Sequence, residues 1–426
     1  MPETIRNHEP YPPLGLAYIA AVLESEGFTV RIWDPGVHNL SVESTFGILS
    51  TFEEPDVVGL GCSTITYKNA LRIASWVRNL WPQALILIGG CHVTFRARET
   101  LLECPEIDVV VRNEGEYAVR ELGRMLNAGR RSFQDVSGIT FRSGGRIVET
   151  APQPPEQDLD ALPFPARHLL DSHRYVPAIV ASRGCTRRCS FCSAGAMNQG
   201  YRVRSAGNVL NELRSMDLSQ TVTFYDNTFS GDRMSAIGIC QAIMQAGLDF
   251  QWACELRVDG ADRQLLQLMH AAGCQYVNFG VESASAAVLR QVHKAISTQQ
   301  VIEAVETALD LRFQVTCSFS IGHPADTEES LEETLVFIKR LQSMGATTLA
   351  AIVTPFPGTE ISDKAAQLGV VIEDFDWEHY TLYRPVMSTS RLSREQIAQW
   401  FARILLETQS YIAADRSKTP EPQSAG

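Results

Sequence analysis

The sequence predicts an α/β protein: an open parallel sheet, then a partial (βα)6 barrel, then a small helical C-terminal segment. Two observations point to this fold. Short apolar runs alternate with amphipathic helical stretches over residues 14–130, and a second such alternation runs over residues 175–360. A stretch rich in Pro and Asp, residues 152–165, separates the two and is typical of a linker.

The first unit, residues 1–130, has the rhythm of an open sheet with helices on both faces. We expect helices over residues 14–26, 68–81 and 116–128, and strands over residues 28–33, 56–61, 84–88 and 107–111. A Rossmann-like domain normally opens with a strand, but the residues before Leu14 are polar and rich in Pro. The first strand is therefore either missing or located upstream of the sequence.

The rest of the chain divides into three further parts. Residues 131–174 hold a predicted hairpin, with a turn at Gly144-Gly145, and the linker. Residues 175–360 hold six candidate strands, and six βα units favour a partial TIM-type barrel with its chemistry at the C-terminal strand ends. These strands are residues 176–182, 221–225, 250–255, 276–281, 314–321 and 347–353. In residues 361–426 we expect a helix over 393–413, opened by a Ser393/Gln396 capping box, and a disordered tail from Ser417.

Composition excludes several classes of function. The 37 basic and 49 acidic residues leave a net charge of −12, which argues against a general nucleic-acid binder. No apolar run approaches the roughly 20 residues that span a bilayer. The residues after Met1 do not resemble a secretory signal, so we expect a cytoplasmic protein. Ten cysteines in such a chain favour metal or redox chemistry over disulfides.

Three of those cysteines form a cluster directly after the first predicted barrel strand. Cys185, Cys189 and Cys192 have the spacing C-x3-C-x2-C. Three thiolates suit three irons of a [4Fe–4S] cube and leave the fourth iron open to a ligand. Zinc is the alternative, but it normally takes a fourth ligand close by, and the next cysteine is Cys240.

The cysteine motif, with Phe191 before its last member, resembles the cluster loop of the radical S-adenosylmethionine (SAM) superfamily. The resemblance implies that the open iron binds SAM and that reductive cleavage of SAM yields a 5′-deoxyadenosyl radical. Further matches follow at predicted strand ends, and they imply SAM-site roles for Asp226, Arg257, Glu282, Ser283, Gly322 and, after the cluster loop, Arg204. Each of these residues also has a structural alternative, as a helix cap, a surface ion pair or a tight turn.

The first unit resembles the cobalamin-binding domain that precedes some radical SAM barrels. The matching segments are residues 12–20, 89–94 and 111–116. The resemblance implies that a corrin ring lies at the C-terminal strand ends, where Gly89 and Gly90 allow close approach and Ser63 and Thr64 donate hydrogen bonds. A turn is the alternative role for the two glycines. His38 lacks the spacing of a lower cobalt ligand, so we expect cobalamin to bind without a protein histidine.

The leading hypothesis is a cobalamin-dependent radical SAM methyltransferase that methylates an unactivated carbon of a small molecule. It would use one SAM to methylate cobalamin and a second SAM to make the radical, with electrons from an external reductant of the flavodoxin or ferredoxin type. The alternatives are a cyclase or rearrangement enzyme like magnesium-protoporphyrin monomethyl ester cyclase, a radical SAM enzyme without cobalamin, and a non-catalytic sensor. Arg202, Arg204 or Arg257 could orient a carboxylate, but the sequence assigns no catalytic residue and no substrate.

Overall fold

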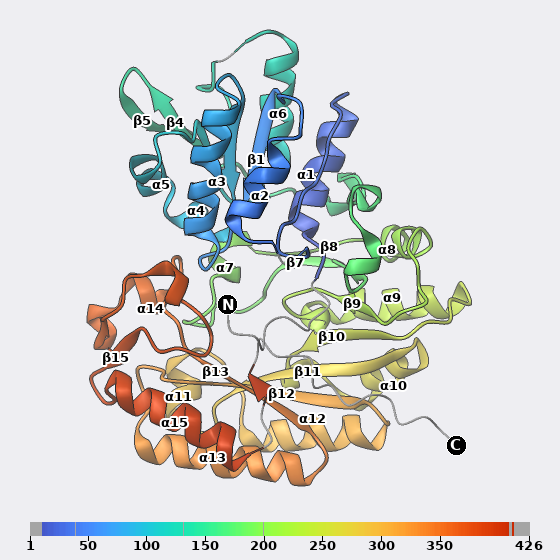
Figure 1. The fold of residues 1–426 in the computed structure, drawn as a ribbon. Coiled ribbons are helices and arrows are strands. Elements are labelled where there is room, and N and C mark those ends of the chain that lie inside the picture. The colour runs from blue at the N-terminus through green and yellow to red at the C-terminus, as the bar shows by residue number, and fades with distance from the viewer. Residues whose placement is uncertain (1–10, 39, 131, 199, 409–410, 413–426) are drawn as a thin grey trace.

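The first sheet contains five strands in the order β1-β2-β3-β4-β5 (Figure 1). They are β1 (Val57–Gly61), β2 (Leu85–Gly89), β3 (Val109–Val111), β4 (Ile139–Ser143) and β5 (Arg146–Glu149). The computed structural model describes residues 11–38, 40–130, 132–198, 200–408 and 411–412. Strands β1 to β3 are parallel, and β4 pairs antiparallel with β3. The predicted hairpin is therefore continuous with this sheet.

Helices cover both faces of the first sheet because its strand residues alternate between two apolar layers. Ile86 and Ile88 pack with residues of α3, whereas Leu85 and Leu87 pack with residues of α6. The helices are α1 (Leu14–Ser25), α2 (Val42–Leu49), α3 (Tyr67–Leu80), α4 (Cys91–Phe95), α5 (Ala97–Glu103) and α6 (Glu116–Asn127). This arrangement is the predicted doubly wound layer.

The strand predicted over residues 28–33 is wrong. Phe28, Val30 and Ile32 are half-buried and alternate with the exposed Thr29 and Arg31, as the pattern indicated, but the segment pairs with no other strand in the described chain. In the described part of the chain, β1 has a neighbour on one side only, and its residues are half-buried or exposed, whereas most of β2 is buried. A strand needs a hydrogen-bonded neighbour, and alternation alone cannot supply one.

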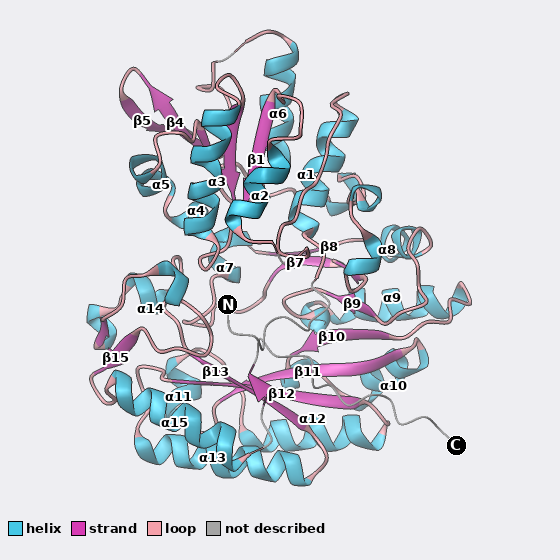
Figure 2. Cartoon of the chain, viewed as in Figure 1, coloured by secondary structure: helices cyan, strands magenta, loops and turns pink. Residues whose placement is uncertain are grey.

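The second sheet has seven parallel strands in the order β16-β13-β12-β11-β10-β9-β6 (Figure 2). The strands are β6 (Ala178–Ile179), β9 (Val222–Phe224), β10 (Trp252–Leu256), β11 (Cys274–Glu282), β12 (Gln314–Ile321), β13 (Thr347–Ile352) and β16 (Tyr411–Ile412). The six predicted barrel strands are confirmed in order. Because β6 and β16 do not pair in the described chain, the barrel is open.

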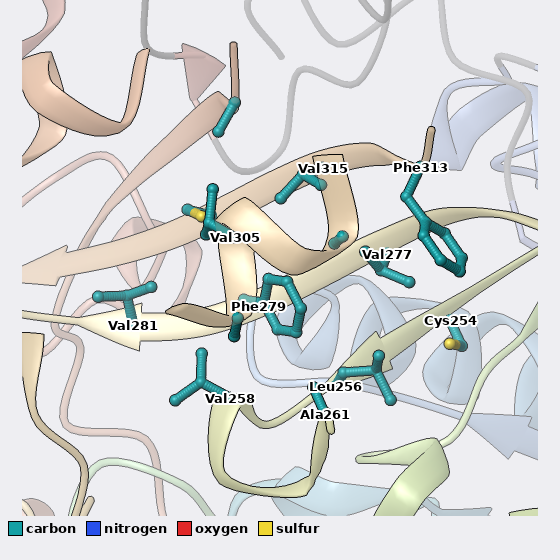
Figure 3. Close-up of a cluster of buried hydrophobic side chains, with 14 of the residues drawn as sticks. Cys254, Leu256, Val258, Ala261, Val277, Phe279, Val281, Val305, Phe313 and Val315 are labelled. Carbon is teal, nitrogen blue, oxygen red and sulfur yellow. The ribbon is translucent and has the colours of Figure 1, made fainter. Parts of the chain in front are cut away.

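Helices pack on the outer face of the second sheet and bury its main core. Figure 3 shows Phe279 of β11 and Val315 of β12 close to Val305 of α12. The helices are α8 (Ala206–Leu213), α9 (Arg233–Gln245), α10 (Arg263–Ala271), α11 (Ala286–Gln291), α12 (Thr298–Asp310) and α13 (Glu328–Ser343). Positions that alternate with this core carry polar side chains: Asn278 donates to Glu255 at 2.8 Å and accepts from Ser318 at 2.9 Å.

The remaining elements connect or extend the two units. Helix α15 begins after the predicted Ser393/Gln396 capping box but ends at Glu407, so the helix predicted to residue 413 is too long, and β16 follows it. The tail predicted from Ser417 lies outside the described residues. The other elements are β7 (Ser182–Gly184), α7 (Ala194–Asn198), β8 (Tyr201–Val203), α14 (Glu360–Asp363), β14 (Val370–Ile372), β15 (Met387–Thr389), α15 (Arg394–Glu407) and the 3-10 turn η8 (Trp377–His379).

Contacts between distant segments hold the first unit against the barrel (Figure 1). Lys68 of α3 donates to Asp376 at 2.8 Å, and the ring of Phe95 lies against Gly358. Arg202 pairs with Glu114 across the two units. No helix among the described residues is long and apolar enough to cross a membrane.

Candidate functional site

A two-stranded ribbon closes the base of the cysteine loop. Strands β7 and β8 pair antiparallel, with Gly184 opposite Tyr201, so the loop between them begins at Cys185. Gly184 has φ +89°, and a Cβ there would lie 1.7 Å from the carbonyl oxygen of Gly200. Only glycine allows this approach, so the ribbon depends on it. Asn227, after β9, donates to the carbonyl of Gly184 at 3.1 Å.

The three loop cysteines are free thiols with unequal exposure. Cys185 and Cys189 are half-buried and Cys192 is exposed. Although the Cys192 residue as a whole is exposed, desolvation of its thiol raises the thiol pKa, and Cys185 raises it further. In the described chain no three His, Cys, Asp or Glu side chains converge on a single metal ion. Three thiolates, one for each of three irons, would suit a [4Fe–4S] cube.

Phe191 anchors the loop to the barrel. Its ring packs edge-on against His323 with a centroid separation of 5.4 Å, and it contacts a buried cluster that includes Val353 and Ile361. The backbone carbonyl of Ser190 accepts from the amide of Ile361 at 3.1 Å. The aromatic residue of the motif therefore fixes the loop between β12 and α14.

The Asp226 carboxylate is hydrogen-bonded to the protein itself, mainly to backbone amides. Its carboxylate accepts from the amide of Ala181 and from the amide and hydroxyl of Ser182. Burial raises the pKa of this carboxyl to about 6. Asp226 thereby ties the end of β9 to the start of the ribbon. A direct cofactor contact, which the sequence predicted, would have to compete with these three bonds.

The arginines predicted as candidates for carboxylate binding already have protein partners. Arg202 pairs with Glu114, and Arg204 pairs with Glu212 at 2.5 Å while donating to the carbonyl of Val180. Arg257 pairs with Asp259 at 2.8 Å and donates to a backbone carbonyl at the same distance. These geometries give all three a structural role.

Glu282 and its neighbours form a buried polar array at the end of β11. The Glu282 carboxylate accepts from Lys294 Nζ at 2.9 Å and from Ser320 Oγ at 2.9 Å, and Ser320 Oγ contacts His323 Nε2 at 2.9 Å. Burial raises the pKa of the Glu282 carboxyl, but the Lys294 ammonium and the Ser320 hydroxyl outweigh it and hold that pKa below its usual range. The sequence alone does not indicate Lys294 and Ser320 as partners, because they lie 12 and 38 residues from Glu282.

Two other residues predicted at the SAM site have local structural partners. Ser283 Oγ lies 3.2 Å from Thr334 Oγ1 and accepts from the amide of Ser285. Gly322, with φ +88°, donates its amide to Asp326 at 2.9 Å. Both residues shape the turns that follow β11 and β12.

A large cavity runs along the unpaired edge of β1 and reaches the C-terminal ends of β1, β2 and β3. Its volume is about 1420 Å³, above the roughly 300–1,000 Å³ of usual small-molecule pockets. The first unit lines it with residues that include Gly61, Gly89 and Gly115, and the ribbon side contributes residues that include Gly184 and Asn227. A Cβ at Gly89 would make only ordinary contacts, at 3.7 Å and beyond, so the backbone leaves space for a side chain that glycine does not fill. The glycine wall at the strand ends would fit a flat macrocycle between those ends and the β7–β8 ribbon.

Gly90 serves the fold as well as the cavity. It has φ +122°, and a Cβ there would lie 2.1 Å from the carbonyl oxygen of Cys62. A bulky residue at Gly90 would therefore disrupt this turn before it obstructed a ligand.

Ser63 and Thr64 do not line the cavity among the described residues. Ser63 Oγ pairs with Thr66 Oγ1 at 3.2 Å, and the buried Thr64 hydroxyl lies 3.2 Å from His92 Nδ1. No histidine of the described chain lines the cavity, and His38 stacks on Trp33 at a centroid separation of 4.7 Å. Binding of cobalamin without a protein histidine therefore stays a prediction.

Both parts of the chain match known families. Residues 7–123 match the B12 binding domain, and residues 179–338 match the radical SAM superfamily. An uncharacterised methyltransferase of Pyrococcus horikoshii is 34% identical over 398 residues, which cover 91% of this chain and 85% of that protein. The anaerobic magnesium-protoporphyrin IX monomethyl ester cyclase of Rubrivivax gelatinosus is 29% identical, over 91% of this chain and 72% of that one.

The solved structures agree on the fold. The radical SAM methyltransferase TsrM of Kitasatospora setae, solved with cobalamin and a [4Fe–4S] cluster bound, superposes with a TM-score of 0.75. The match covers 98% of this chain and 90% of that chain, at 16% sequence identity.

Proposed function

This chain belongs to the family of radical SAM enzymes that carry a B12-binding domain, and from that premise we propose that it methylates a carbon of a small-molecule substrate. One observation carries the proposal. A single cavity is lined both by the strand ends of the first sheet and by the ribbon that holds the cysteine loop. A macrocycle bound there would lie between the first sheet and the ribbon that holds the cysteine loop.

The residues of this chain have separable tasks in that reaction. Cys185, Cys189 and Cys192 supply three thiolates for iron, and Phe191 holds their loop in place. Gly61 and Gly89 leave room for the ring on the opposite wall. When bound, the cluster with SAM supplies hydrogen-atom abstraction, and cobalamin supplies a transferable methyl group.

A cyclase or rearrangement is the second candidate, because one relative is named as a cyclase and shares the same coverage of this chain. Both reactions need electrons, which we assign to an external carrier of the flavodoxin or ferredoxin type. The net charge of −12 does not favour docking of an acidic carrier over most of the surface. A local basic patch would have to guide it.

The test is anaerobic reconstitution with iron, sulfide and hydroxocobalamin, followed by SAM and dithionite. We expect about four irons and one cobalt per chain, and we expect both S-adenosylhomocysteine and 5′-deoxyadenosine. Replacement of Cys185, Cys189 and Cys192 by Ala should abolish iron and deoxyadenosine, while Cys91→Ala, at a half-exposed thiol outside the loop, should retain both.

The products distinguish the candidates. Deoxyadenosine without S-adenosylhomocysteine would favour the cyclase or rearrangement. Loss of cobalt binding in the intact protein would overturn the cobalamin part, and zinc in place of iron would overturn the whole assignment.

A further inference from the structure

The large cavity of the first unit extends well beyond the strand ends. Every residue of β1 lines it, and so does every residue from Phe28 to Trp33. It also reaches Pro55 and Asp56, which precede β1, so it follows the whole length of that strand. We call the part of the cavity between residues 28–33 and β1 the strand slot.

The backbone of β1 presents unpaired hydrogen-bonding groups to the strand slot. On the opposite side, the carbonyl of Asp56 accepts from the amide of Leu85 at 2.9 Å, and the amide of Cys62 donates to Gly89 at 3.0 Å. In a parallel ladder alternate residues bond to opposite neighbours, so three residues of β1 direct their amides into the slot. These are Val57, Gly59 and Gly61. In the described chain they meet no partner strand, and such an edge is a template for one.

Apolar side chains from two helix layers close the two faces of the strand slot. From α1 and α6 the lining includes Leu23, Leu122 and Leu126, and from α2 and α3 it includes Leu49, Ile73 and Val77. These are the same two layers that cover the faces of β2. A chain segment in the slot would bury both of its faces, and strands buried in this way have nearly continuous apolar sequences.

Helix α1 begins at the end of the slot where β1 ends. A Cβ at Gly61 would lie 3.2 Å from the side chain of Leu16 in the first turn of α1, and Pro12 also lines the cavity. After α1, Gly27, with φ +87°, turns the chain into residues 28–33. A strand in the slot, parallel to β1, would therefore lead directly into α1. With residues 28–33 it would form a β-α-β unit, the usual way to connect parallel strands.

Such a strand also accounts for the pattern of residues 28–33. They alternate in exposure like a strand, with Thr29 and Arg31 exposed, yet they pair with no strand of the described chain. A strand in the slot would supply the neighbour that this segment lacks. Residues 28–33 would then be the edge of the sheet, where exposed charged side chains are common.

We propose that the strand slot receives one apolar β-strand that runs parallel to β1 and leads into α1 in the same polypeptide. Residues 1–10 lie outside the described residues, and their sequence, with Glu3, Arg6 and Glu9, does not suit a slot with two apolar faces. The occupant is therefore a further, apolar segment. A filled slot leaves the ends of β1, β2 and β3 open to a macrocycle, so this proposal does not rest on the proposed function.

The experiment supplies such a strand to the full chain. A copy of residues 84–89, Ala-Leu-Ile-Leu-Ile-Gly, is joined ahead of Met1, because these residues form the mostly buried β2 in the same sheet. Hydrogen exchange followed by mass spectrometry compares the extended and the original chain. We expect the amides of residues 29–33 and 57–61 to exchange at least about tenfold more slowly in the extended chain. The matched control is the same extension with Asp at its two Ile positions, which should add no protection.

Gly59→Pro tests the edge of β1 directly, because proline lacks the amide that would bond to the added strand. A Cβ at Gly59 meets no atom within 4 Å, so the change creates no overlap. In the extended chain, Gly59→Pro should lose the added protection and Gly59→Ala should keep it. If circular dichroism shows that Gly59→Pro does not fold, the comparison with the Asp-containing extension decides.

Three results would overturn the proposal. They are no added protection with the apolar extension, equal protection with the Asp-containing extension, and equal protection in a folded Gly59→Pro variant. Iron and cobalamin binding by the original chain test the proposed function separately, so failure of one proposal is distinguishable from failure of the other.

Discussion

At the scale of single residues, the side chains predicted to bind cofactors are largely bonded to the protein itself. Asp226 holds backbone amides, and Arg202 and Arg204 pair with glutamates. Residue type marked them as candidates, but the Ser182 amide that Asp226 binds lies 44 residues away along the chain, and the Glu114 partner of Arg202 lies 88 residues away. Residue type predicts that a buried charge has a partner and does not say which one.

His92 gives a pH prediction at this scale. Burial, with Arg96 adding to it, lowers the pKa of His92 from 6.5 to about 4. Its Nε2 is buried without a hydrogen-bond partner, so the folded protein resists protonation. Between pH 6.5 and about pH 4, the unfolded chain binds a proton at His92 that the folded chain does not. Stability should therefore fall by about 3 kcal/mol as the pH drops from 6.5 to 4.

Urea unfolding of the His92→Gln and wild-type proteins at several pH values measures this effect. The His92→Gln variant should lose most of the pH dependence of the unfolding free energy between pH 4 and 6.5. The His173→Gln variant, changed at an exposed position, should keep this dependence. Equal slopes for all three proteins would show that His92 is not the group responsible.

At the scale of elements, the β7–β8 ribbon decides whether the cysteines form a site. The spacing of the cysteines predicts ligands, but the ribbon brings the two ends of their loop together. Its closure depends on the absence of a side chain at Gly184. The capping box at Ser393 shows the same kind of local control, because it starts α15 where the sequence indicated.

Gly184→Ala should abolish iron binding. The new Cβ would overlap the Gly200 carbonyl, and the ribbon would have to open. Gly200→Ala is the control, because Gly200 also has a positive φ, +123°, but a Cβ there meets no atom within 4 Å. It should cost about 1–3 kcal/mol of stability through backbone strain and retain iron. Chemical analysis measures the iron content of both variants. A wild-type iron content in Gly184→Ala would contradict the role of the ribbon.

At the scale of the whole molecule, the site exists because the two units meet. Lys68 and Asp376, Phe95 and Gly358, and Arg202 with Glu114 join segments that are far apart in sequence. With these contacts in place, the strand ends of the first sheet and the β7–β8 ribbon line one cavity. Neither unit alone supplies both walls.

Gly89→Leu tests the use of this cavity. Its Cβ fits without overlap, so the longer side chain should project into the cavity and weaken cobalamin binding at least tenfold, or by about 1.4 kcal/mol. Iron content should not change. Gly47→Leu, at an exposed helical glycine with open space around it, should bind cobalamin like the wild-type protein. Absorbance titration with hydroxocobalamin measures both, and equal affinities would place the ring elsewhere.

The sequence by itself determined the features that depend on neighbouring residues. These are the C-x3-C-x2-C loop after a strand, the six barrel strands in order and the capping box at Ser393. Periodicity, turn chemistry and ligand spacing act over a few residues, so they can be recognised without knowledge of the fold.

Only the tertiary structure decided which distant segments pair. Residues 28–33 have the alternation of a strand but no neighbouring strand in the described chain, while the hairpin joins β3. Lys294 has no distinguishing local pattern, yet the end of β11 places it against Glu282. Hydrogen bonds and ion pairs across long separations depend on how sheets and helices pack, and this packing sums many weak contacts along the whole chain.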